Sequence, residues 1–484
     1  MIEIAFLNYE QFGAVGDGVT DDMAAIIACH DAANESGTSV KCKDGARYYI
    51  GGGARAATIR TDVDFGTAEF IIDDRSLEDI QSSVFCVVSD FEPYALAIHS
   101  LHRDQKNIGQ TFSGDTYVKV SSSEKRIFIR KGLNSGSGTD AEECFFVNAA
   151  GEIQNRLNWD YAVISHAEAR EMDHRPITIK GGIFTTIANQ APSFYHYHHR
   201  GVTIQRDYVT VEGLAHRVTG EGDYGAPYRG FLSVLDCVGV QLINCLLTPH
   251  RTYQTPSKVP GKMVDMGTYD LNLTFAIRVH MRGLKQTIDI MDKRYWGIMG
   301  SNFCKELYLE DCIVSRFDAH QGVTDATIKG CELGHQCLNL IGCGDFLIED
   351  TLTRGGCLIV LRPDYGSTWE GSITVRNCSW IPQSNDGAVI GCYNEGDHDF
   401  GYVCYMPHTV TVEGLRILDG AAVAGKENQL FVLGHYDKSF APGKPFPYVP
   451  TQKLVISGLS VESGNEIPIF KESALYPTLS VEYK

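Results

Sequence analysis

The sequence predicts an all-β fold, a single-stranded parallel β-helix with a short N-terminal capping helix. A six-residue phrase recurs along the chain, alternates apolar and polar residues, and closes on turn residues. Four of its copies read LYLEDC, ATIKGC, FLIEDT and ITVRNC. The copies begin at Ile177, Val209, Val240, Leu307, Ala326, Phe346, Ile373, Val410 and Leu454. Each copy is expected to be one strand of one coil.

The spacing of the copies favours a β-helix over other parallel sheets. The four copies from Leu307 to Ile373 follow one another at 19, 20 and 27 residues. Only 13 residues separate the first copy from the second, which is too few for a crossover helix. Successive coils would then stack at the strand spacing of about 4.8 Å. A β-sandwich of short strands is the alternative, but it would not repeat one hexapeptide.

Two positions of the phrase have their own expected roles. Its last residue is a cysteine in four copies, which predicts a ladder of buried, reduced thiols at Cys245, Cys312, Cys331 and Cys378. The fifth residue of the phrase is expected to lie in a tight turn with left-handed backbone. Asparagine and aspartate tolerate this conformation, and they occupy the position at Asn244, Asp311, Asp350 and Asn377.

Length and composition limit the classes of function. The 484 residues are expected to divide into a capping motif at 1–40, early coils with an irregular insertion at 41–170, and the main β-helix at 171–484. Sixty acidic against 42 basic residues give a net charge of −18, which argues against a nucleic acid or an anionic membrane as partner.

The cysteines and the N-terminus indicate where the protein works. The 15 cysteines contain no C-x-x-C pair, so they are expected to be free thiols in a reducing cytoplasm. The N-terminus has no basic segment followed by an apolar one, and no apolar segment of 18 residues occurs. The protein is therefore expected in the cytoplasm, or released by lysis as part of a phage-like particle.

The N-terminal motif predicts a turn followed by a helix. FGAVGDGVTDD runs from Phe12 to Asp22, and the apolar residues that follow recur at helical spacing after Thr20, the expected cap. Such a helix would cover the open end of the coil. A phosphate-binding loop is not supported, because the sequence lacks G-x-x-x-x-G-K.

Two segments carry a family resemblance. FGAVGDGVTDD followed by AAIIACHDAA resembles the opening of the pectate lyase-like superfamily of right-handed β-helices, which includes polygalacturonase-type hydrolases, polysaccharide lyases and phage tailspikes. The segment from Arg126 to Tyr161, with its W-D near the end, resembles phage pre-neck appendage and tailspike-type proteins. The resemblance implies a right-handed coil, a polysaccharide or oligosaccharide as ligand, and a homotrimer.

Hydrolases of this superfamily carry their acids in the turn before a strand of the broad face, which implies a stripe of site residues here. The expected catalytic residues are Asp292, Asp318, His320 and His335, with Asp292 and Asp318 as the leading acid and base. The expected substrate-binding residues are Asp270, Lys293, Arg294, Tyr295, Trp296, Arg316 and Arg354. A solvated face with incidental charges is the alternative.

The sequence leaves the reaction open. The polygalacturonase motifs N-T-D, D-D, G-H-G and R-I-K occur only as fragments such as FDAH and LGHQ. Glycoside hydrolysis is favoured, with no cofactor. A polysaccharide lyase with calcium is the second choice, and a glycan-binding appendage that does not cleave is the alternative function. Tyr195 to His199 reads YHYHH, which is interpreted as a polar loop rather than a metal site.

Overall fold

The structure is a computed structural model that describes residues 6–77, 82–129, 138–189, 198–222, 228–256, 261, 263–392, 400–434, 448–470 and 476–484. The chain forms two compact units. Unit 1 comprises Met1–Pro93, Arg170–Thr255 and Asp265–Met299. Unit 2 comprises Tyr94–Ala169, Pro256–Val264 and Gly300–Lys484. The division predicted from the sequence, at residues 40 and 170, stays a prediction.

Unit 1 contains stacked coils whose strands pair in parallel. One ladder joins β1 (Phe6–Leu7), β3 (Ser39–Lys41), β6 (Val63–Asp73), β12 (Ile177–Ile187), β14 (Val209–Glu212), β17 (Gln241–Ile243) and β22 (Ile277–Arg282). A second joins β2 (Asp17–Asp21), β4 (Arg47–Ile50), β6, β12, β15 (Ala215–Thr219), β18 (Leu246–Leu247) and β23 (Lys285–Gln286). A third joins β5 (Ala57–Ile59), β7 (Phe85–Val88), β13 (Val202–Gln205), β16 (Leu232–Leu235) and β21 (Leu271–Thr274).

Unit 2 continues the same pattern. One ladder joins β24 (Met299–Glu310), β26 (Gln321–Lys329), β28 (Gly342–Glu349), β31 (Trp369–Arg376), β35 (Thr409–Glu413), β39 (Lys453–Ser457) and β41 (Ser480–Tyr483). A second joins β25 (Ile313–Asp318), β27 (Glu332–Leu340), β29 (Leu352–Thr353), β32 (Ser379–Trp380), β36 (Arg416–Ile417) and β40 (Ser460–Val461). A third joins β27, β30 (Ile359–Leu361), β33 (Asp386–Cys392) and β37 (Gln429–Leu433). The predicted parallel β-helix is confirmed.

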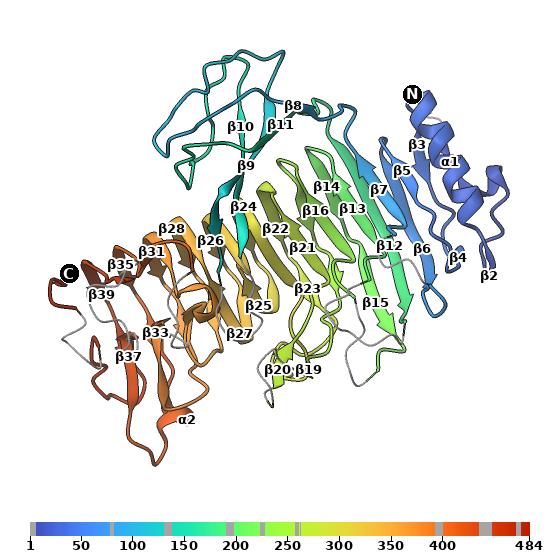
Figure 1. Ribbon diagram of the computed structural model, residues 1–484. Helices are drawn as coiled ribbons and strands as arrows, with labels where there is room; N and C mark the ends of the chain where they lie inside the picture. Colours follow the sequence, from blue (N-terminus) through green and yellow to red (C-terminus); the bar gives the residue numbers. More distant parts are fainter. Residues whose placement is uncertain are drawn as a thin grey trace. The chain divides into compact units, whose positions relative to one another are not determined.

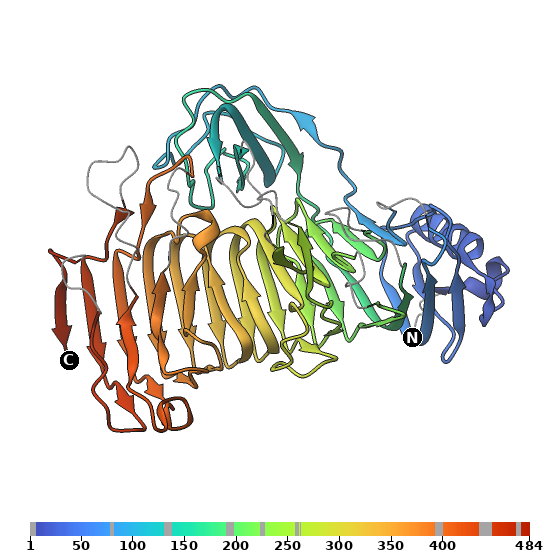
Figure 2. The same ribbon diagram turned by 60° about the horizontal axis from the view of Figure 1, so that its bottom comes forward.

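A separate antiparallel sheet interrupts the coils. It holds β8 (Tyr94–Ala95), β9 (Thr116–Ile127), β10 (Thr139–Val147) and β11 (His166–Glu171) in the order β10-β9-β11-β8. Its buried residues form their own apolar cluster with parts of unit 2 such as Ile341 and Tyr365. Figures 1 and 2 show this inserted sheet beside the coils of unit 2. The smaller elements of unit 2 are η2 (Pro363–Tyr365), β34 (Cys404–Tyr405), α2 (Gly420–Val423) and β38 (Tyr448–Val449).

The N-terminal helix α1 (Met23–Ser36) packs on β3 and β5 in unit 1 (Figure 1), as the capping prediction required. The predicted cap residue is wrong. Thr20 lies in β2, where its hydroxyl donates to Asp17 Oδ2 at 2.9 Å. Asp22 is the N-cap, and its carboxylate instead accepts the backbone N–H groups of Val15 and Gly16 at 2.7 and 3.2 Å. The side chain that could cap the helix therefore holds the glycine-rich turn.

The cysteine ladder is confirmed. Every one of the 15 cysteines is a free thiol, and the four at the end of the phrase are buried. In unit 2 the backbone N–H of Cys312 donates to Cys331 Sγ at 3.4 Å, so two rungs are in direct contact. The thiol of Cys331 in turn donates to the carbonyl of Leu309 at 3.5 Å. Small thiols thus fill the interior where coils turn.

The outer face of unit 2 carries charges of alternating sign at one position of the phrase. Lys329 lies 3.0 Å from Glu349, and Glu349 lies 3.3 Å from Arg376. Arg376 also lies 2.8 Å from Glu413 on the next coil. These residues are direct partners in the ladder. A slip of one residue would break these ion pairs and would turn the apolar residues outward.

The left-handed turn positions are also confirmed, with φ of 52° at Asn244, 52° at Asp311, 50° at Asp350 and 51° at Asn377. Asn377 donates its backbone N–H to the carbonyl of Glu413 at 2.7 Å, so the turn is tied to the following coil. Asparagine, aspartate and glycine are the residues that adopt this conformation most readily.

Asn377 gives a test of this backbone constraint. Asn377→Ala is expected to lower the free energy of unfolding by about 1 kcal/mol, because alanine pays the steric penalty of left-handed backbone. Asn377→Gly is the matched control and should be close to wild type, since glycine pays no such penalty. Urea denaturation measures both. Equal stability of the alanine and glycine variants would contradict the account.

Candidate functional site

Unit 2 contains a cavity of about 410 Å³ between the inserted sheet and the coils. One wall comes from the insertion: residues of β9 and the loop that follows it, together with the loop at 158–160. The other comes from β24, β26, β28 and β31 and the segment at 401–405. The lining residues used below are Arg103, Lys125, Phe128, Asn158, Trp159, Asp160, Phe303, Thr324, Cys343, Glu370, Tyr402 and Tyr405.

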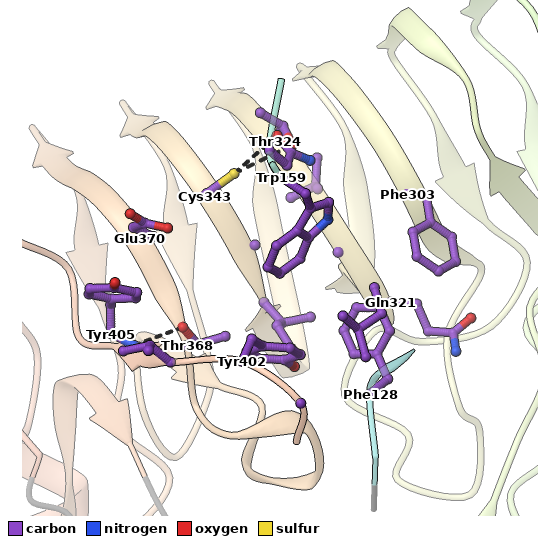
Figure 3. A pocket seen from close by; sticks show the side chains of 18 of the residues that line it. Phe128, Trp159, Phe303, Gln321, Thr324, Cys343, Thr368, Glu370, Tyr402 and Tyr405 are labelled. Atoms are coloured by element: carbon purple, nitrogen blue, oxygen red, sulfur yellow. Dashed lines mark hydrogen bonds between the residues drawn. The ribbon is translucent and has the colours of Figure 1, made fainter. Parts of the chain in front are cut away.

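Aromatic rings dominate the cavity (Figure 3). Phe128 packs edge-on against Phe303 and Tyr402, with ring centroids 5.6 and 5.7 Å apart. Trp159 lies tilted against Tyr402 at 5.7 Å. The Tyr402 hydroxyl donates to the carbonyl of Tyr365 at 2.7 Å, which fixes its ring. Flat, rigid rings of this kind present apolar faces to a ligand at little conformational cost.

One arginine connects the two carboxylates of the cavity. The backbone N–H of Arg103 donates to Asp160 Oδ1 at 2.9 Å. Its guanidinium Nη1 donates to Glu370 Oε1, also at 2.9 Å. The side chains of Arg103 and Glu370 are each 35% exposed, so their ion pair is partly shielded from solvent. Two acidic groups and one basic group therefore meet at one ligand-sized cavity.

Lys125 adds a second cation. Its ammonium lies 4.5 Å from the centroid of the Trp159 ring, in a cation–π contact. Burial lowers the pKa of Lys125, against an opposing effect from the Asp160 carboxylate. In the part of the chain that the structure describes, no ion pair joins Lys125 to a carboxylate. A cation thus lies over the ring of Trp159.

A buried ion pair holds the loop that carries Trp159. Lys305 of β24 and Glu143 of β10 are joined at 2.7 Å, and both side chains are 1% exposed. The Glu143 carboxylate also accepts the backbone N–H groups of Asn158 and Trp159, at 2.9 and 3.3 Å. Lys305 donates a further hydrogen bond of 2.5 Å to the carbonyl of Arg156. A lysine of the coil thereby positions the aromatic residue of the insertion.

Polar side chains complete the junction. Thr324 of β26 donates its hydroxyl to Asn158 Oδ1 at 3.0 Å, and Cys343 Sγ lies 3.4 Å from the same oxygen. Burial raises the pKa of the Cys343 thiol to about 11. The thiol is therefore protonated at neutral pH and serves as a small packing group rather than a nucleophile.

The site residues expected from the sequence are divided between the two units, and none of them lines the cavity. In unit 2, Asp318 is 0% exposed and lies 2.5 Å from Arg316 and 2.6 Å from Arg362. His320 Nδ1 lies 3.0 Å from Asn302 Oδ1, and Arg354 forms an ion pair with Glu332 at 2.8 Å. His335 is half-buried in β27.

In unit 1 the expected residues have mostly local partners. Asp292 is 2.6 Å from Arg294 within one turn, and Lys293 is exposed. Tyr295 and Trp296 are half-buried, and the backbone N–H of Trp296 donates to the carbonyl of His250. Asp292 and Asp318 belong to different units. The catalytic role of both, and the binding roles of the other expected residues, stay predictions.

Asp270 is fully buried, as Asp318 is. It is 0% exposed, lies 2.8 Å from His216 Nδ1, and accepts the backbone N–H of Thr248 at 2.9 Å. His250 lies 3.3 Å from Asp270 and 3.4 Å from Glu221. Burial alone lowers the pKa of His250, but the two carboxylates outweigh that effect and raise it to about 10. The cluster is an internal charge network of unit 1.

The YHYHH segment, whose histidines could suggest a metal site, lies partly outside the described residues. His196 of the YHYHH segment is not among them, and His198 is buried with its ring 5.7 Å from that of Tyr228. Within the described ranges, no group of three or more His, Cys, Asp or Glu side chains is arranged to hold a metal ion. A search of the same ranges finds no helix long and apolar enough to cross a membrane.

The sequence did not predict the cavity, because the inserted segment that forms one of its walls does not contain the repeated phrase. The one available signal was the W-D at Trp159 and Asp160, part of the segment that resembles tailspike-type proteins. Glu370 and Thr324 lie on coil strands, in positions that the phrase does not mark.

Solved structures of phage tailspikes have the same fold. The tailspike of Pseudomonas phage phi297 is similar with 14% identity and a TM-score of 0.55, over 98% of this chain and 83% of that one. The tailspike of Acinetobacter baumannii bacteriophage AP22, in complex with an A. baumannii capsular saccharide, has 11% identity and a TM-score of 0.51, over 98% of this chain and 79% of that one. No protein-family model and no curated protein matches the sequence. The similarity confirms the right-handed β-helix expected from the resemblance.

The buried pair of Lys305 and Glu143 gives a test of how the insertion is held. Lys305→Met leaves a buried carboxylate without its cation and is expected to lower the free energy of unfolding by about 3–5 kcal/mol. Lys305→Met combined with Glu143→Gln should lose less, because no charge is then left uncompensated. Lys329→Met, at a lysine that is 52% exposed, is the matched control. If Lys305→Met and Lys329→Met lowered the free energy of unfolding equally, the buried ion pair would not be what holds the insertion.

The charge network of Asp270 predicts a pH dependence. His250 has a raised pKa in the folded protein, so the stability it contributes is fully present below the unfolded value of about 6.5. That stability is lost as pH rises towards about 10. Between about pH 6.5 and pH 9, the free energy of unfolding should fall more steeply in the wild type than in His250→Gln. Urea denaturation across this range measures the two slopes, and identical slopes would rule out a charged His250.

Proposed function

We propose that the protein is carbohydrate-active: it binds a polysaccharide or oligosaccharide in the cavity of unit 2 and hydrolyses it. The observation that carries the proposal is the cavity itself, where aromatic rings lie beside two carboxylates and an arginine. Sugar rings have apolar faces that stack on aromatic rings, and hydroxyl groups that hydrogen-bond to charged side chains. The binding of a capsular saccharide by the AP22 tailspike, which has a similar fold, supports the same class of ligand.

Binding without cleavage is the second candidate, because Arg103 holds both carboxylates in a way that a purely binding site would also show. In that case the chain would act as an appendage of a phage-like particle.

A homotrimer, expected from the resemblance to tailspikes, is part of this proposal. Light scattering that gave the mass of a single chain would refute the trimer. Hydrolysis needs no cofactor, whereas elimination would favour calcium.

Trp159 tests the binding site. Trp159→Ala is expected to weaken binding of a responsive polysaccharide roughly tenfold, since aromatic stacking contributes about 0.5–1.5 kcal/mol beyond buried area. Isothermal titration with a panel of purified bacterial capsular and wall polysaccharides measures the affinity. Tyr483→Ala is the matched control, because Tyr483 is 73% exposed and does not line the cavity. If the two variants bind alike, or no polysaccharide of the panel binds the wild type, the proposed function fails.

A further inference from the structure

We infer that Asp160 and Glu370 are the catalytic carboxyl pair of the cavity, with Arg103 as the residue that positions both. The inference rests on the proposed function and assigns the groups that would carry out its hydrolysis. Glycoside cleavage requires two carboxyl groups that flank the scissile bond, one to donate a proton and one to activate water or attack the sugar. In the described residues that line the cavity, Asp160 and Glu370 are the only carboxylic acids.

The two residues come from opposite walls. Asp160 directly follows Trp159 in the loop of the inserted sheet, whereas Glu370 lies in β31 of the coil. Figure 3 shows Glu370 and Trp159 at different places around the same space. A sugar chain that lies against Trp159 would therefore have one carboxyl group on each side. This is the arrangement that cleavage between two sugar units needs.

Arg103 sets the spacing of the pair. Its backbone N–H bonds to Asp160, and its guanidinium bonds to Glu370, each at 2.9 Å. The two donors belong to the backbone and to the end of the side chain, so one residue is bonded to both carboxylates. A wide separation leaves room for a water molecule and is the geometry of direct displacement, whereas a covalent sugar–enzyme intermediate needs a closer pair. The proposed reaction is direct displacement by water with inversion of configuration, and the stereochemistry of the product tests it.

The partners of the two carboxylates distinguish their roles. Glu370, on the coil wall, accepts a hydrogen bond from the Arg103 guanidinium, and we assign it as the base. Asp160 Oδ1 accepts the backbone N–H of Arg103 and lies 3.9 Å from His102 Nδ1, and the Lys125 ammonium lies over the Trp159 ring. A sugar that stacks on Trp159 takes the place of this ammonium. Asp160 directly follows the ring on which the sugar would stack, and we assign it as the acid.

The reaction then balances with water as the co-reactant. Asp160 donates its proton to the glycosidic oxygen, and the bond from that oxygen to the anomeric carbon breaks with its electron pair left on the oxygen. Glu370 takes a proton from the attacking water, whose oxygen bonds to the anomeric carbon. Glu370 then releases this proton to solvent, and Asp160 takes one up. The products are two shorter saccharides, one of them with a new reducing end.

The experiment uses Glu370→Gln and Asp160→Asn in the full chain, with the polysaccharide that the wild type binds. Each variant is expected to lower the rate of new reducing ends by a factor on the order of 10² to 10⁴, with the dissociation constant within about threefold of wild type. Asp292→Asn and Asp318→Asn are the matched comparison, because they remove the acids expected from the sequence. Melting curves of all four variants separate lost activity from lost folding.

Each outcome decides between the proposals. If the wild type binds but releases no reducing ends, or if Glu370→Gln and Asp160→Asn cleave at the wild-type rate, the catalytic assignment is overturned while the binding proposal stands. Loss of cleavage in folded Asp292→Asn or Asp318→Asn, with the cavity variants unaffected, also overturns it. Retained anomeric configuration, measured by nuclear magnetic resonance on the initial product, would overturn the direct displacement. Loss of binding in Trp159→Ala with Tyr483→Ala unaffected supports the cavity independently.

Discussion

The register between neighbouring coils is the constraint on which the rest of the structure depends. Each strand of a ladder pairs residue by residue with the same position of the previous coil, as from Phe346–Glu349 to Ile373–Arg376. Because side chains alternate in direction along a strand, a slip of one residue would exchange the inner and outer faces. Apolar residues and thiols inside, and charges of alternating sign outside, select the same register. Extra residues are accommodated where a coil turns or as a local irregularity of a ladder, as between Thr324 and Ala326, and the pairing resumes beyond them.

The cavity follows from one such insertion. An antiparallel sheet of the insertion lies beside the coils of unit 2, and a charged pair from both, Lys305 and Glu143, is buried in their contact. Burying an ion pair brings little net stability, because both charges lose their hydration. Its role is geometric: the same carboxylate also binds the backbone at Trp159. A loop without repeating structure thereby gains a defined position relative to the strands that carry Thr324 and Glu370.

The sequence predicted the coil because its signals are local and repeated. Alternation within the phrase, the small residue at its end and the turn residue before it act within a few positions, so Cys331 and Asn377 lie where the pattern places them. The cap at Thr20 failed for a physical reason. Two acidic residues follow it, and Asp22 starts the helix while its carboxylate binds the preceding turn. Local propensity did not show that the carboxylate of Asp22 would bind the backbone of the turn, or that Thr20 would not cap the helix.

The site could not be predicted in the same way, because it depends on contacts between distant parts of the chain. Arg103 and Glu370 are 267 positions apart, and Lys305 and Glu143 are 162 apart. Asp318, chosen from the sequence, has partners in its own coil and two coils away, at Arg316 and Arg362. In a stacked coil, charged residues of this kind form ion pairs across coils. A ligand-sized space arises instead where the repeat is broken, so changes in the insertion can alter what binds while the register of the coil is kept.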